Sequence, residues 1–320
     1  MTTPTPVSLT AAAAGAAEAQ LESVPCNLCG SDAFVVLTPS RRQPGQPIDL
    51  QTVFRSSGDE PLMDQLVKCT SCGLVYVRPR LRADLVLTGY QGGTDEGFVS
   101  QVAFRERTFR RCLDRIERVQ RPPGKRVLDV GAAGGSFLAM ARERGYQPLG
   151  CEPSAWMCAF ARDHYGLELE PGTLFDMALE PGSVDLLSLW DVLEHTPDPK
   201  AVLDHAHRMM APGGVLAISV PDYGSLAARL MGRRWVFLLT VHLYYFTRRT
   251  LAALLRRCGF EPLKFQPHLQ TLELGYVAQR AAPYLGPLGG ALTGGARALG
   301  VSRLPLHYWV GQTMVVARKA

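Results

Sequence analysis

The hydrophobic pattern of the chain changes character near residue 126. Beyond that point, short apolar runs alternate with segments in which apolar residues recur with helical spacing. Strands alternating with amphipathic helices predict βαβ units, and therefore an α/β fold with a mainly parallel, doubly wound sheet. The expected strands cover 126–130, 146–154, 167–170, 184–190 and 215–221, and the expected helices cover 135–145, 155–166 and 199–214.

A further amphipathic helix is expected over 98–119, before the first of these strands. Its apolar positions recur at steps near 3.5 and are Phe98, Val102, Phe109, Cys112, Ile116 and Val119. Its outer face carries Arg107, Arg110, Arg111, Arg115 and Arg118. We interpret this basic face as a solvated surface, because no aromatic residues interleave with the arginines. The alternative is a surface that grips phosphates or RNA. Residues 78–97 are read as a turn-rich connector.

The N-terminal region 1–24 is rich in alanine, threonine and proline and has no periodic pattern, so it is expected to be a disordered tail. No basic segment precedes its apolar stretch, and we therefore expect a cytoplasmic protein without a signal peptide. The longest apolar run, 235–246, is too short to span a bilayer. The chain is 47% hydrophobic and 20% charged with a net charge of +5, which indicates a globular protein and does not by itself imply a nucleic-acid partner.

Four of the eight cysteines form two Cys-x-x-Cys knuckles, Cys26 with Cys29 and Cys69 with Cys72. Each knuckle is followed by a glycine that lets the backbone curl around a metal. Two knuckles supply four thiolates at tetrahedral angles, the ligand set preferred by structural Zn²⁺. Four reduced, metal-free thiols are the alternative. The remaining cysteines, Cys112, Cys151, Cys158 and Cys258, are read as small hydrophobic residues.

The segment around the knuckles is predicted to be a small β-rich zinc ribbon covering 25–80, with strands at 33–38 and 50–55 and a strand–knuckle–strand unit at 66–79. The second domain then covers 81–320. No shared core is evident from the sequence. Loss of the metal is therefore expected to unfold the ribbon and to leave much of the second domain folded.

The sequence "VLDVGAAGGSF" at 127–137 places a loop of small residues at the carboxyl end of the first parallel strand. Ligands of doubly wound sheets bind at this edge. A dinucleotide fingerprint would need glycine at position 133, where this chain has Ala133. The loop therefore suits a nucleoside with an uncharged or zwitterionic tail better than a pyrophosphate. Asp129 can order the loop or accept from an ammonium group, and Glu152 can accept from two ribose hydroxyls.

These segments, together with "GCEPS", "LWDVLEHTPDP" and "MMAPGGVLAISVPD", resemble the successive motifs of class I S-adenosylmethionine-dependent methyltransferases over about residues 100–270. Residues 242–262 resemble the substrate-side segment of small-molecule methyltransferases, including ubiquinone-pathway O-methyltransferases, and 310–320 resembles the last strand. Zinc ribbons precede this domain in some sugar C-methyltransferases. The resemblance implies a Rossmann-like, seven-stranded methyltransferase sheet and S-adenosyl-L-methionine as cofactor.

The resemblance also assigns cofactor-binding residues. The glycine loop would pack on the methionine part and ribose, Glu152 would bind the ribose, the segment after the third strand would cup the adenine, and an aromatic residue would lie beside the sulfonium. The matching positions are Asp129, Gly131, Ala132, Gly134, Glu152, Pro153, Thr173, Leu174, Asp176 and Trp190. Asp176 could instead cap the adjoining turn, and Trp190 could be a core residue.

His195 and His242 are the candidate catalytic residues, because an oxygen nucleophile can require a general base. The segment Asp191–Glu194–His195 also resembles an E-x-x-E-H arrangement that holds a divalent metal in some O-methyltransferases, so Mg²⁺ is an alternative to a base or to a purely structural histidine.

The expected function is methyl transfer to a small-molecule acceptor, with oxygen the expected nucleophile, in a sugar, quinone or natural-product pathway. The alternative is an RNA methyltransferase that docks through the ribbon and the basic helix. The segment 271–304 is rich in glycine, alanine and leucine and is expected to be a helical insert or lid, with peripheral membrane contact as a further reading. The sequence does not indicate an oligomeric state.

Overall fold

A seven-stranded sheet forms the centre of the computed structural model, which describes residues 19–43, 48–50, 60–285 and 287–320. The strand order is β12-β15-β10-β9-β6-β7-β8. In chain order these strands are β6 (Arg126–Val130), β7 (Gln147–Glu152), β8 (Glu170–Pro171), β9 (Val184–Trp190), β10 (Met210–Pro221), β12 (Phe260–Pro267) and β15 (Gln312–Lys319). Only β15 runs against its neighbours, so the predicted Rossmann-like, mostly parallel sheet is confirmed.

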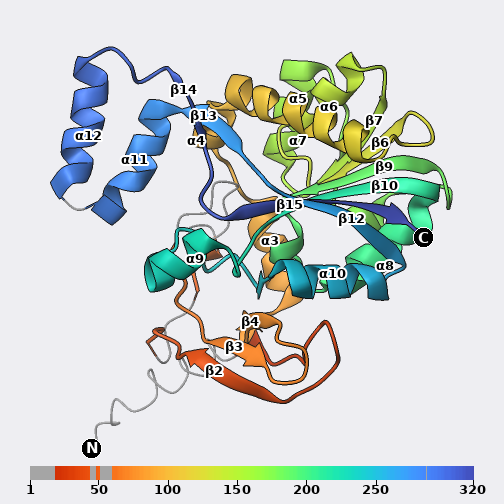
Figure 1. Cartoon of the computed structure of the whole chain (residues 1–320), viewed down its shortest axis with the longest axis horizontal. Coiled ribbons are helices and arrows are strands. Elements are labelled where there is room, and N and C mark those ends of the chain that lie inside the picture. The colour runs from red at the N-terminus through yellow and green to blue at the C-terminus, as the bar shows by residue number, and fades with distance from the viewer. Residues whose placement is uncertain (1–18, 44–47, 51–59, 286) are drawn as a thin grey trace, which may run out of the picture.

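Helices cover both faces of this sheet (Figure 1). α5 (Val102–Val119), α6 (Ser136–Glu143) and α7 (Ala155–Tyr165) lie on one side, and α8 (Pro199–Met209) and α10 (Arg248–Arg257) lie on the other. The sheet strands between them are almost wholly buried, as their apolar runs require. This layering brings the carboxyl ends of β6, β7 and β9 to one edge of the sheet.

The cysteine-rich region forms a four-stranded antiparallel sheet in the order β11-β4-β3-β2. Three strands come from this region: β2 (Phe34–Thr38), β3 (Leu66–Cys69) and β4 (Val75–Val77). The fourth, β11 (Tyr244–Tyr245), comes from the α/β part of the chain and pairs with β4. The sheet lies directly below α10 and α3 (Ala83–Gln91) in Figure 1. The predicted strand at 50–55 lies outside the described residues except for Leu50.

The expectation that the two regions share no core is wrong. Leu28, Val67 and Tyr76 of the cysteine-rich region belong to the same buried cluster as Leu243 and Leu254. Polar contacts add to this packing. Arg257 Nη1 donates to the Leu28 carbonyl at 2.5 Å, and the Asn27 side chain donates to Asp198 at 2.7 Å. Sequence reasoning missed this because the pairing of β4 with β11 joins segments far apart in the chain.

Several element boundaries also differ from the sequence prediction. The connector at 78–97 contains α3 (Ala83–Gln91) and α4 (Glu96–Val99), and a turn at Ser100–Gln101 separates α4 from α5. In the tail expected to be disordered, β1 (Leu21–Glu22) pairs with β5 (Arg80–Leu81), and the Glu22 carboxylate accepts from Arg80 at 3.0 Å. After the α7 C-cap, the Leu167 N–H donates to the Ala161 carbonyl and completes the helix end. The strand expected at 167–170 is therefore reduced to β8 at Glu170–Pro171.

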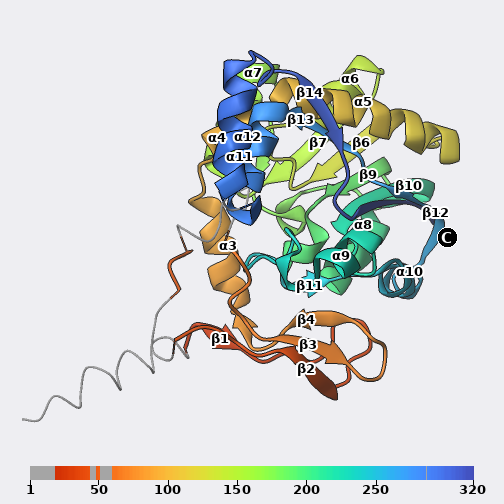
Figure 2. The same cartoon turned by 60° about the vertical axis from the view of Figure 1, so that its left-hand side comes forward.

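The C-terminal insert is helical, as predicted, and is framed by a two-stranded hairpin. Its elements are β13 (Gln270–Glu273), α11 (Leu274–Leu285), α12 (Pro287–Ala298) and β14 (Pro305–Tyr308). The two helices extend to one side of the central sheet in Figure 1 and lie in front of it in Figure 2. Among the helices of the described part of the chain, none combines the length and the hydrophobicity needed to cross a bilayer.

The basic face of α5 is largely engaged with neighbouring elements. Arg110 pairs with Glu143 at 3.3 Å, Arg115 donates to the Pro267 carbonyl at 2.9 Å, and Arg111 donates to Thr271 and contacts His307. These arginines therefore tie α5 to α6, to β12 and to the insert hairpin, so the expectation of a merely solvated face is only partly right.

Candidate active site

A cavity of about 1890 Å³ lies at the carboxyl edge of the sheet and continues between the insert, α3 and the cysteine-rich sheet. Nine of the ten predicted cofactor residues line it, and so do both candidate catalytic histidines. These are Asp129, Gly131, Ala132, Gly134, Glu152, Pro153, Thr173, Leu174, Trp190, His195 and His242. Residues far apart in the sequence therefore meet in one space.

The glycine loop after β6 is a tight turn that leaves its backbone accessible. Gly131 has φ +67°, and a Cβ there would lie 2.7 Å from Val192, so a larger residue would clash. Ala133 adopts φ +47°, which is unfavourable for a residue with a side chain. Its N–H donates to the Glu152 carboxylate at 2.9 Å. This bond shapes the loop around the cavity.

Two buried carboxylates flank this loop. Glu152 accepts from the Ala133 and Ser154 N–H groups, one on each oxygen, so each oxygen retains a free lone-pair direction. Asp129 accepts from the Ser188 hydroxyl at 2.6 Å. Burial raises the pKa of Asp129 to about 8, with a further increase from the Glu152 charge, and burial also raises the pKa of Glu152. A cationic or hydroxyl-rich ligand would stabilise both ionised carboxylates, whereas a pyrophosphate would be repelled.

The segment after β8 also lines the cavity. Leu174 is buried, and Thr173 begins the short 3-10 helix η1 (Leu174–Asp176). Asp176 does not line the cavity. Its carboxylate accepts from the Thr173 N–H at 2.8 Å and from the Thr173 hydroxyl at 2.7 Å, which completes a capping box. The assignment of Asp176 to the cofactor is therefore replaced by its alternative, a cap.

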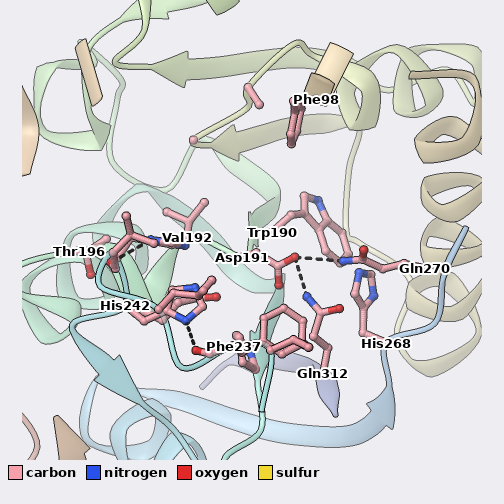
Figure 3. Close-up of a pocket in the computed structure, with 18 of the residues that line it drawn as sticks. Phe98, Trp190, Asp191, Val192, Thr196, Phe237, His242, His268, Gln270 and Gln312 are labelled. Carbon is pink, nitrogen blue, oxygen red and sulfur yellow. Dashed lines mark hydrogen bonds between the residues drawn. The ribbon is translucent and has the colours of Figure 1, made fainter. Parts of the chain in front are cut away.

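Trp190 ends β9, Asp191 follows it, and both lie at the centre of the cavity (Figure 3). The Trp190 ring packs against Phe109 and Phe137 and stacks on His268 at 5.7 Å between centroids. Asp191 adopts φ +54°. Its carboxylate accepts from the Ser219 hydroxyl and from the side-chain amides of Gln270 and Gln312. The Asp191 carboxylate is thus directed toward β13 and β15.

Glu194, His195 and His242 form a second polar group, and their potential ligand atoms all lie within 4.8 Å of one another. Both Glu194 oxygens are buried without a hydrogen-bond partner. His195 Nδ1 lies 2.7 Å from the Tyr90 hydroxyl and 3.1 Å from the Val241 carbonyl. The Phe237 carbonyl lies 2.8 Å from His242 Nδ1 and fixes that ring. Glu194, His195 and His242 could therefore ligate a divalent metal. The Asp191 carboxylate is instead bonded to Ser219, Gln270 and Gln312.

The protonation of this group is set by burial. Burial lowers the pKa of His242 to about 4, and burial together with the neighbouring His242 lowers the pKa of His195 well below its usual value. Burial, followed by the charge of Asp191, raises the pKa of Glu194 well above its usual range. Both imidazoles are therefore neutral at pH 7, the form that a proton acceptor needs.

The four knuckle cysteines converge at one point of the cysteine-rich sheet. Cys26 Sγ lies 3.4 Å from Cys72 Sγ, Cys29 Sγ lies 3.5 Å from Cys69 Sγ, and all four sulfurs lie within 4.8 Å of one another. Tetrahedral Zn–S bonds of about 2.3 Å need sulfurs at this spacing. The glycines after the knuckles, Gly30 and Gly73, have positive φ, a conformation that lets the backbone curl around a metal. The thiol group therefore fits a structural zinc ion.

Comparison with known proteins identifies the class of the chain. A family model described as a methyltransferase domain matches residues 104–264, and the chain therefore belongs to the methyltransferase domain family. This is the S-adenosylmethionine-dependent class that the motifs resemble.

Two relatives are ubiquinone biosynthesis O-methyltransferases. The protein from Pseudomonas aeruginosa (strain LESB58) is 36% identical over 105 residues, which make up 30% of this chain and 44% of that protein. The protein from Xanthomonas euvesicatoria is 29% identical over 187 residues, which make up 50% of this chain and 77% of that protein. The chain thus spans less than half the length of the first relative. A solved SAM-dependent methyltransferase from Archaeoglobus fulgidus is 17% identical, with a TM-score of 0.47 covering 70% of this chain and 100% of that one.

Sequence reasoning missed several cavity residues, notably Tyr90, Arg105, His268, Gln270 and Gln312. Tyr90 lies on α3, which was read as a connector. Gln270 on β13 and Gln312 on β15 are far from Asp191 in the sequence, and their side chains reach its carboxylate only in the folded protein. An amphipathic pattern at 83–91 was a usable signal for α3, whereas no local signal marks the glutamines.

Proposed function

We propose that the protein transfers a methyl group from S-adenosylmethionine to a small-molecule acceptor in this cavity, and that the accepting atom is an oxygen. Its substrate would belong to a sugar, quinone or natural-product pathway. The observation that carries this proposal is the continuity of one cavity from the buried carboxylates Asp129 and Glu152 to the neutral histidines His195 and His242.

The residues present fit the cofactor. S-adenosylmethionine, when bound, supplies an electrophilic methyl group on a sulfonium. Glu152 would accept from the ribose hydroxyls, Asp129 would face the ammonium group, Thr173 and Leu174 would hold the adenine, and Trp190 would provide an aromatic face for the cation. The glycine loop would pack against the ligand with Gly131, Ala132 and Gly134, next to Pro153.

The remaining residues would act on the acceptor. The apolar walls exclude water and align the acceptor, which is the main requirement of an in-line displacement. His195 or His242, neutral at pH 7, would take the proton of the acceptor hydroxyl or orient that hydroxyl. If Glu194, His195 and His242 hold a Mg²⁺ ion, that ion would lower the pKa of the hydroxyl instead.

The acceptor is open to direct experiment. The protein is incubated with S-adenosylmethionine labelled in its methyl group and with fractionated metabolite extract. We expect label in a small molecule, in a form that resists the mild base that cleaves esters. Label found only in RNA would instead favour the docking alternative.

Glu152→Ala should weaken the binding of S-adenosylhomocysteine about 10- to 100-fold, because two charge-assisted hydrogen bonds to ribose and the bond to the Ala133 N–H are lost. Titration calorimetry measures the change. Glu170→Ala, at an exposed acid of the adjacent strand, is the matched control and should bind normally. An unchanged affinity in Glu152→Ala would mean that the ribose lies elsewhere.

The acid limb of the kcat/KM profile should lie well below pH 6.5. A histidine acts as a base only when neutral, and burial lowers the pKa of His242 to about 4 and that of His195 in the same direction. Activity is therefore kept as the pH falls through 6.5 and is lost only nearer the lowered values. A half-maximal rate at pH 6.5 or above would contradict a buried histidine base.

We further propose that Cys26, Cys29, Cys69 and Cys72 hold one structural zinc ion in a ribbon-like module covering about 25–80. The spacing of the sulfurs supports this. Elemental analysis of protein purified without added metal should find close to one zinc per chain. Protein with Cys69→Ser and Cys72→Ser should contain almost none, and equal zinc in both preparations would exclude this site.

A further inference from the structure

The part of the cavity under the insert contains a guanidinium group that forms no ion pair with a described residue. Arg105 extends from the first turns of α5 and lines the cavity with Tyr276, Tyr308 and Gln270. Its Nε is buried and has no hydrogen-bond partner. Among the described residues, no carboxylate lies within ion-pair distance of Arg105. Burial accordingly lowers the pKa of Arg105.

The contacts of Arg105 hold its guanidinium plane in place. The group lies 3.6 Å from the centroid of the Phe98 ring, a stacked arrangement that leaves the N–H edge available. Two hydrogen bonds fasten α5 and the residue before it to the insert hairpin. Thr271 N–H donates to the Thr108 hydroxyl, and Glu273 N–H donates to the Gln101 side chain. These bonds join the wall that carries Arg105 to the insert hairpin.

The nearest acid in the centre of the cavity, Asp191, is already satisfied. Its carboxylate accepts from Ser219, Gln270 and Gln312, and Gln270 in turn accepts from the Tyr308 hydroxyl at 2.9 Å. These are neutral donors. A partly buried charge without an ion partner is costly unless a ligand supplies the opposite charge.

We infer that Arg105 binds an acidic group of the methyl acceptor, a carboxylate or a phosphate, and that it places the acceptor beneath the insert with its reacting oxygen toward Trp190 and the histidines. Phe98, Trp190 and Gln270 face the same part of the cavity (Figure 3). A planar guanidinium suits a carboxylate or phosphate through two parallel hydrogen bonds. This inference rests on the proposed function, because it describes the acceptor side of the same site.

The methionine carboxylate of the cofactor is the other anion that could reach the cavity. The neighbours of Arg105 favour the acceptor. On the cofactor side, Asp129 is bonded to Ser188 and Glu152 is bonded to the Ala133 N–H. Arg105 instead lines the cavity with Gln270 of β13, Tyr276 of α11 and Tyr308 of β14, which all belong to the insert and its hairpin.

The test uses benzoate and its neutral counterpart benzamide as probes, titrated into the full chain saturated with S-adenosylhomocysteine. The wild-type protein should bind benzoate at least about tenfold more tightly than benzamide, because only the acid pairs with Arg105. Arg105→Gln should remove this preference and leave benzamide binding unchanged. Arg107→Gln, at an exposed arginine on the same helix, is the matched control and should keep the preference.

Each other outcome overturns the inference. A wild-type protein that does not prefer benzoate, or a preference that survives Arg105→Gln, means that Arg105 anchors no acceptor anion. A loss of S-adenosylhomocysteine affinity in Arg105→Gln, with the benzoate preference retained, assigns the arginine to the cofactor carboxylate. Failure of the wild-type protein to bind S-adenosylhomocysteine at all contradicts the proposed function itself, and is measured in the same titrations.

Discussion

Replacing His195 or His242 by alanine should lower kcat on the true acceptor by roughly 10²- to 10⁴-fold, with little change in the affinity for S-adenosylhomocysteine. His195 is held by Tyr90 and the Val241 carbonyl, and the two imidazole centroids lie 4.6 Å apart. Both rings are neutral at pH 7 and line the cavity, and their hydrogen-bond partners are Tyr90, Val241 and Phe237 rather than Asp129 or Glu152. Their removal should therefore affect the chemical step and leave cofactor binding intact.

The controls separate a base from a metal ligand. His164→Ala, at an exposed histidine of α7, should have normal kcat. If Mg²⁺ is bound, Glu194→Ala should be as harmful as the histidine variants, and inhibition by EDTA should be reversed by Mg²⁺ rather than by Zn²⁺. Asp191→Ala distinguishes metal binding by Asp191, Glu194 and His195 from binding by Glu194, His195 and His242. The carboxylate of Asp191 is bound by Ser219 and Gln312. Asp191→Ala should therefore be as harmful as Glu194→Ala only if Asp191 is a ligand. Full turnover in both histidine variants would contradict the catalytic assignment.

Removing the proposed zinc ion through Cys69→Ser with Cys72→Ser should destabilise the whole described fold. The pairing of β4 with β11 places the cysteine-rich sheet against the segment that carries His242. The Leu243 N–H donates to the Glu194 carbonyl at 2.8 Å, and the Leu243 carbonyl accepts from Val77 at 2.9 Å. Structural zinc contributes about 10–16 kcal/mol in small modules, comparable to the net stability of a domain.

Differential scanning calorimetry measures this coupling. We expect one transition, lowered by at least about 10 °C in the double variant. Cys158→Ser, at a free cysteine outside the knuckles, is the matched control and should change the transition temperature little. A second transition that keeps the wild-type temperature would mean that the α/β part folds independently of the cysteine-rich sheet, as the sequence alone suggested.

The parts of the fold that could be predicted are those set by local patterns. The apolar runs of β6, β9 and β10 and the small residues after β6 identify a doubly wound sheet and its ligand edge, because each signal lies within a few residues. The knuckle cysteines were likewise predictable, since their spacing and the following glycines are local.

The parts that were missed depend on contacts between distant segments. β11 is two residues long and joins β4 across more than half of the chain, so its sequence does not identify its partner. The contact between Tyr90 and His195 and the three donors around Asp191 arise in the same way. Asp191 also adopts a left-handed backbone, which is uncommon outside glycine and has no marker in the sequence.

Titration calorimetry of the full chain with S-adenosylhomocysteine and with NADH tests the central claim most directly. Two buried carboxylates and Ala133 in place of glycine favour a nucleoside with a zwitterionic tail over a pyrophosphate. We therefore predict one S-adenosylhomocysteine bound per chain and no heat of binding with NADH. Binding of NADH, or the absence of S-adenosylhomocysteine binding by the folded protein, would contradict the account.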